Sequence, residues 1–82
     1  MQFRSVGLYR DHMVYYNVST EDGWHYQAVL LKCKDNPVPP PPPLIHLRKE
    51  GMRWQGNADE ELVRFLGFDI DQQIKRKPLR SS

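Results

Sequence analysis

The chain has very little cysteine and histidine, and this scarcity excludes several classes of protein. Of its 82 residues, one is cysteine and three are histidine. The single thiol, Cys33, excludes an internal disulfide framework and fits a reducing compartment. The histidines are scattered, and no HxH, HxxxH or CxxC spacing occurs, so the sequence predicts no metal site and no cofactor. Cys33 ends an apolar strand pattern, which favours a buried structural thiol over a reactive one.

Long apolar runs and phosphate-binding glycine patterns are also missing. No segment approaches the ~20 apolar residues that a membrane span needs, and residues 1–4 contain no apolar leader core. Gly51, Gly56 and Gly67 do not follow the GxGxxG or GxxxxGK order. The acidic residues 59–61 fit the first turn of a helix, where acids are favoured for dipole reasons alone. We therefore expect a cytoplasmic protein that neither catalyses a reaction nor binds a membrane.

The length of the chain fits one domain, and its charge is unevenly distributed. The net charge is +2, from 12 basic and 10 acidic side chains. Four of the basic residues lie among the last eight, so the remaining eight are outnumbered by the ten acidic ones. The sequence predicts a mildly acidic domain over residues 1–74 and a basic, disordered tail over residues 75–82. The basic residues of this tail are Lys75, Arg76, Lys77 and Arg80.

Residues 2–33 carry the alternating apolar and polar pattern of β-strands. Residues 2–9, 12–18 and 24–33 predict a three-stranded antiparallel meander. A two-residue first loop pairs Tyr9 with His12 and Phe3 with Val18, and a five-residue second loop pairs Val18 with Trp24. One face then forms the core, with Phe3, Val14, Tyr16, Val18, Trp24, Tyr26, Ala28 and Leu30. The other face is half apolar, and either the C-terminal half or a second copy of the chain could cover it.

The C-terminal half, residues 44–74, predicts short strands followed by a helix. Residues 44–48 and 52–55 suit a fourth and a fifth strand or an ordered loop. Asn57 and Glu60 form a capping pattern for a helix over residues 58–66, with Gly67 as its C-cap and Asp69 starting a second short helix. Such a pair resembles a helix-turn-helix only superficially, because the turn lacks the usual small residue before its glycine. The expected fold is therefore a small α+β domain: a meander of three to five antiparallel strands, a polyproline crossover and a C-terminal helix packed on the sheet.

The proline run is the segment least suited to building a core. Residues 37–43 contain six of the seven prolines, which exclude a helix or a central strand there. The run can act as a stiff strap of roughly 20 Å, or its pre-extended backbone can dock into the aromatic groove of another protein. It could also lie on the chain's own Trp24 or Trp54.

We expect a small protein-interaction or regulatory module that binds another protein, with a homodimer as a further option. The predicted partner-binding residues are Pro39, Pro40, Pro41, Pro42, Pro43 and Trp54. The alternative is a nucleic-acid-binding protein, in which strand aromatics stack on bases while Lys75, Arg76, Lys77 and Arg80 contact phosphates.

Overall fold

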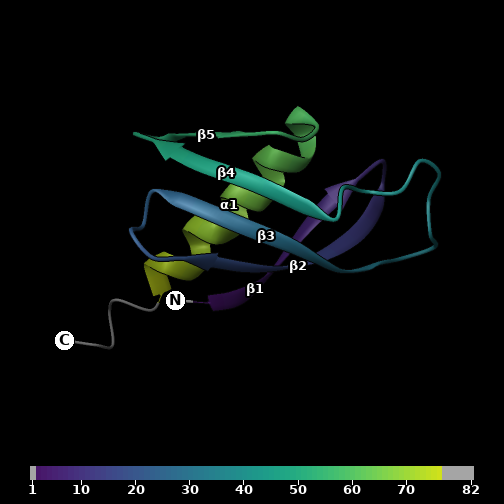
Figure 1. Ribbon diagram of the computed structural model, residues 1–82, viewed down its shortest axis with the longest axis horizontal. Helices are drawn as coiled ribbons and strands as arrows, with labels where there is room; N and C mark the ends of the chain where they lie inside the picture. Colours follow the sequence, from purple (N-terminus) through teal and green to yellow (C-terminus); the bar gives the residue numbers. More distant parts are fainter. Residues whose placement is uncertain (1, 77–82) are drawn as a thin grey trace.

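A computed structural model describes residues 2–76 and shows five strands followed by one helix (Figure 1). The strands form a single sheet in the order β1-β2-β3-β4-β5, and every neighbouring pair is antiparallel. The sheet curls into a half-barrel, and the helix packs diagonally across its inner face. The predicted α+β meander with a C-terminal helix is confirmed. The elements are β1 Gln2–Tyr9, β2 His12–Thr20, β3 His25–Cys33, β4 Leu44–Glu50, β5 Arg53–Gly56 and α1 Glu60–Arg76.

The β1–β2 hairpin has the register that the sequence predicts. Tyr9 pairs with His12, and Phe3 pairs with Val18. The turn residues Arg10 and Asp11 have φ values of 47° and 68°. A two-residue turn of this kind needs positive φ at both positions, so the turn adopts the required geometry without glycine.

The predicted β2–β3 register is wrong by four residues. Val18 pairs with Ala28 rather than with Trp24. The turn extends further along the chain than predicted because the Asp22 carboxylate accepts hydrogen bonds from the main-chain N–H groups of Trp24 and His25, both at 2.8 Å. Trp24 therefore remains in the turn and is 58% exposed instead of buried. Because the error is an even number of residues, the other side chains keep their predicted faces.

The core lies between the inner face of the sheet and helix α1. Every residue of the predicted core face is buried or packs against the core, except Trp24. The core also contains two buried polar side chains, Ser5 and Thr20. The buried apolar residues are Phe3, Tyr9, Val14, Tyr16, Val18, Tyr26, Ala28, Ile45, Leu47, Leu62, Val63, Leu66 and Ile70.

Helix α1 is continuous, so the predicted break at Gly67 is wrong and no helix-turn-helix forms over the described residues. Gly67 is buried inside the helix, against the indole of Trp54. A Cβ atom built at position 67 would lie 2.4 Å from Cγ of Trp54. The glycine is therefore required by a close approach between helix and sheet, not by a helix end.

Two aspartates of α1 fasten the helix to the two sides of the half-barrel. Asp69 accepts hydrogen bonds from the Ser5 hydroxyl at 2.7 Å and from the Val6 N–H at 3.3 Å, both on β1. Asp71 binds Lys49 Nζ of β4 at 2.6 Å and Trp54 Nε1 of β5 at 3.0 Å. The helix thus connects the first and the last strand of the sheet.

The outer face of the sheet is not covered by any element among residues 2–76. The helix packs on the inner face, so the C-terminal half, one of the two covers considered for the outer face, does not cover it within residues 2–76. Within the same range, no helix combines the length and the apolar character required to cross a membrane. Exposed apolar side chains on the outer face are Met13, Val29 and Leu44, and Leu31 lies beside them at the bulge of β3.

Candidate functional site: the proline loop and the groove beside β5

The proline run forms the loop of the β3–β4 hairpin. β3 and β4 are neighbouring antiparallel strands, and Val29 pairs with Leu44 directly after the run. The segment therefore leaves the sheet and returns to it, instead of crossing one of its faces. Figure 1 shows this loop projecting at one end of the molecule.

Two tyrosines of the core face hold the loop through its main-chain carbonyls. The Tyr9 hydroxyl donates to the carbonyl oxygens of Pro39 at 2.8 Å and of Pro40 at 3.2 Å. The Tyr16 hydroxyl donates to the Pro42 carbonyl at 2.7 Å. Proline keeps its carbonyl acceptor while lacking the N–H donor, so this loop can be anchored without leaving main-chain donors unpaired. The run thus lies on Tyr9 and Tyr16, and not on Trp24 or Trp54.

Burial keeps the Tyr16 anchor in its donating form. Desolvation is the main cause that raises the pKa of Tyr16 well above its ordinary value, with the nearby Cys33 and Tyr9 adding to the effect. Burial also raises the pKa of the Cys33 thiol, and Asp35 contributes in the same direction. A thiol with a raised pKa is a weak nucleophile near neutral pH, which fits a packing role for Cys33.

The loop has a buried inner side and an exposed outer side. Pro41 is buried, and Pro37 and Pro42 are half-buried. Val38 is 91% exposed, and Pro39, Pro40 and Pro43 are exposed as well. Of the five predicted partner-binding prolines, three therefore point outward, while Pro41 and Pro42 support the loop from within.

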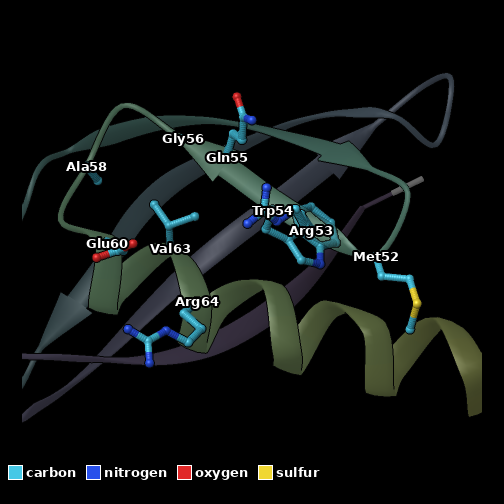
Figure 2. A pocket seen from close by; sticks show the side chains of 9 residues that line it. All are labelled: Met52, Arg53, Trp54, Gln55, Gly56, Ala58, Glu60, Val63 and Arg64. Carbon is cyan, nitrogen blue, oxygen red and sulfur yellow. The ribbon is translucent and has the colours of Figure 1, made fainter.

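A groove of about 590 Å³ lies between β5 and the first turns of α1 (Figure 2). The apolar side chains of Trp54, Ala58 and Val63 line it, together with the guanidinium groups of Arg53 and Arg64. Figure 2 shows Trp54 between the strand and the helix, with Arg64 and Glu60 projecting from the helix. The full lining is Met52, Arg53, Trp54, Gln55, Gly56, Ala58, Glu60, Val63 and Arg64.

The indole of Trp54 is fixed by contacts within the protein. Its Nε1–H donates to Asp71, and its ring meets that of Tyr26 edge-on with centroids 5.1 Å apart. Lys49 Nζ lies 5.6 Å from the centroid of the Trp54 ring. Trp54 thus lines a groove while joining β5 to the helix. This second role could not be read from the sequence, because the prediction ended the helix at Gly67 and did not show that Asp71 and Gly67 belong to one continuous helix beside β5.

The strand aromatics of the nucleic-acid alternative are mostly buried. Tyr9, Tyr16 and Tyr26 are buried, so these strand aromatics cannot stack on bases. Lys75 and Arg76 belong to the last turn of α1. Lys77 and Arg80 lie outside the described residues.

Histidine and aspartate side chains form two separate contacts within residues 2–76. The Asp22 carboxylate forms a 2.9 Å hydrogen bond with His25 Nδ1. This bond is the largest cause that lowers the pKa of the Asp22 carboxyl well below its usual range, and the main-chain N–H groups of His25 and Trp24 add to the effect. His12 lies 3.6 Å from Asp35. Over residues 2–76, no three His, Cys, Asp or Glu side chains converge as metal ligands would. The Asp22–His25 pair lies within the β2–β3 turn, which the hydrogen bonds of Asp22 stabilise.

Comparison of the chain with protein-family models, with curated proteins and with solved structures gave no match.

Proposed function

We propose that the protein is a non-catalytic interaction module that binds another protein through the outer side of its proline loop. The observation that carries this proposal is the combination of anchoring and exposure. Carbonyls on the inner side are bonded by Tyr9 and Tyr16, while Val38, Pro39, Pro40 and Pro43 are exposed. A segment held in this way loses little conformational entropy when it binds.

Aromatic-lined grooves, such as those of SH3, WW and EVH1 domains, are the partner chemistry that suits exposed prolines. The basic side chains Lys32 and Lys34 are exposed just before the loop and favour a groove with an acidic rim. The unpaired thiol of Cys33 fits a reducing compartment, so we extend the proposal to a cytoplasmic protein.

The test is a titration of the protein against a panel of SH3, WW and EVH1 domains, compared with a variant carrying Pro39→Ala, Pro40→Ala and Pro43→Ala. Alanine removes the exposed rings and keeps the carbonyls that accept from Tyr9, so the loop should stay anchored. We expect at least one domain to bind the native protein and to lose about tenfold or more in affinity for the variant.

The matched control is Met52→Ala, which removes an exposed apolar side chain at the opposite turn and should change no affinity. Thermal unfolding of each variant separates lost binding from lost folding. Equal binding of the native protein and the triple variant, or no binding to any groove domain, contradicts the proposal.

A further inference from the structure

The two edge strands of the sheet, β1 and β5, differ in whether side chains pair with their outward main-chain groups. On β1, the helix supplies partners for main-chain groups that point away from β2. Asp69 accepts from the Val6 N–H at 3.3 Å, and Gln73 Nε2 donates to the Arg4 carbonyl at 2.8 Å. These side chains occupy the positions that a neighbouring strand would otherwise take. The β1 edge is therefore closed to a further strand along these residues.

On β5, the phase of the ladder shows which main-chain groups point outward. The Asn57 N–H donates to the His46 carbonyl at 3.4 Å, which makes this a hydrogen-bonded position. Hydrogen-bonded positions alternate in an antiparallel ladder, so the next ones are Arg48 with Gln55 and Glu50 with Arg53. The main-chain groups of Trp54 and Gly56 consequently point away from β4, toward the groove.

Within residues 2–76, these outward groups have no capping side chain comparable to Asp69 and Gln73. Among the side-chain hydrogen bonds of residues 2–76, none involves the N–H or the carbonyl of Trp54 or Gly56. The helix does approach β5 here, because Cγ2 of Val63 lies 2.9 Å from a Cβ built at Gly56. The groove lined by Trp54 and Gly56 nevertheless leaves space beside the strand.

The charge of the groove is positive. Arg53 and Arg64 line it, and neither guanidinium forms an ion pair within the described part of the chain. Glu60 is the one acidic side chain in the lining. Glu50 stands opposite Arg53 in the ladder, but its carboxylate is bound by Arg48 at 2.6 Å and by Gln55 at 2.8 Å. Two arginines against one free carboxylate favour an anionic occupant.

We propose that the free edge of β5 binds an extended, acidic peptide segment of a partner protein as a sixth strand. The main-chain groups of Trp54 and Gly56 would pair with the peptide backbone, as in other cases of strand addition. Carboxylates of the peptide would meet Arg53 and Arg64. This surface is separate from the proline loop, so the inference stands whether or not that loop binds a partner.

A peptide suits this edge better than a second copy of the chain or a nucleic acid. The β5 strand has only four residues, which is short for the main contact of a stable dimer. A second copy would also bring its own Arg53 and Arg64 to a surface that is already cationic. A nucleic acid would use the arginines, but the strand edge offers it no matching ladder.

The probe is a short synthetic peptide in which glutamate alternates with valine. We expect it to shift the backbone amide signals of Trp54 and Gly56 in NMR spectra and to slow hydrogen exchange at both. The same peptide N-methylated at alternate residues, so that one edge loses its donors, should bind about tenfold or more weakly. This comparison leaves the protein unchanged and does not depend on the folding of a variant.

The charge requirement is tested with Arg53→Glu combined with Arg64→Glu, which should weaken binding by about tenfold or more. Arg4→Glu, an exposed position on β1, is the control for net charge and should have little effect. Equal binding of a lysine–valine peptide, no shift at Trp54 and Gly56, or equal binding of the N-methylated peptide overturns the proposal. A dimer that sedimentation detects and that pairs through β5 also overturns the proposal. Tighter binding of a single-stranded oligonucleotide at the same amides overturns it as well.

Discussion

The carboxylate of Asp69 accepts a 2.7 Å hydrogen bond from the hydroxyl of Ser5, although the two residues are 64 positions apart in the chain. Ser5 is almost completely buried, so its hydroxyl depends on this partner. Asp69 also accepts from Gln73 Nε2 at 2.8 Å, which orients the carboxylate toward β1. This small network joins the first strand to the helix.

Asp69→Ala should lower the free energy of unfolding by about 1–3 kcal/mol, because it leaves the buried Ser5 hydroxyl and the Val6 N–H without their acceptor. Urea unfolding measures the effect. Glu21→Ala, which removes an exposed carboxylate in a turn, should stay within about 0.5 kcal/mol of the native protein. Similar values for the two variants would contradict the structural role of Asp69.

Gly67→Ala should destabilise the protein although alanine is the better helix former. The intrinsic gain of about 1 kcal/mol is outweighed by the overlap of the new methyl group with Trp54, which costs about 1–3 kcal/mol or more. Thermal unfolding of Gly67→Ala, of Trp54→Leu and of the double variant forms a cycle. We expect the double variant to be more stable than the sum of the single changes predicts, and strict additivity would refute the contact.

Tyr16→Phe should loosen the proline loop at a cost of about 1 kcal/mol in stability, because it removes the donor to Pro42. The readout is faster hydrogen exchange at the Leu30 amide, which donates to the Pro43 carbonyl at 2.8 Å. Tyr15→Phe is the matched control, since Tyr15 lies half-buried on the outer face of the sheet. Unchanged exchange at Leu30 in the Tyr16 variant would show that the hydroxyl does not anchor the loop.

Alkaline solution should destabilise the native protein more than the Tyr16→Phe variant. Because burial raises the pKa of Tyr16 in the folded state, the folded protein holds this proton more tightly than the unfolded chain does. The stability from this difference is fully present below the ordinary tyrosine pKa of about 10 and is lost as the pH rises above it. Urea unfolding at about pH 9 and about pH 11 measures the loss, and an equal decline in both proteins contradicts the prediction.

The part of the fold that could be predicted is the part determined by local pattern. A two-residue turn leaves one register for β1 and β2, and the alternation of Phe3, Val14 and Val18 identifies the core face. The β2–β3 register failed because a side chain, Asp22, shapes the turn through bonds to Trp24 and His25. The strand and turn propensities of the residues do not reveal such a hydrogen bond between a side chain and the main chain.

The site was only partly predictable for a similar reason. Composition identified the proline run, but its anchors, Tyr9 and Tyr16, come from strands distant in sequence and become visible only once the loop is placed. Gly67 resembled a helix end because glycine often follows the last turn of a helix. Its actual role is to leave space for the indole of Trp54, which approaches from another element. Arg53 and Arg64 line the same groove because helix α1 packs beside β5, and that packing has no local sequence signal.

The dependence of β1 on α1 affects how the chain can fold during synthesis. The Val6 N–H and the Arg4 carbonyl cannot form their hydrogen bonds to Asp69 and Gln73 until the ribosome adds these residues, more than sixty positions later. Until then, β1 is an unprotected edge that can pair with other nascent chains. Such long-range closure raises the contact order and slows folding. Chains truncated before α1 should therefore aggregate.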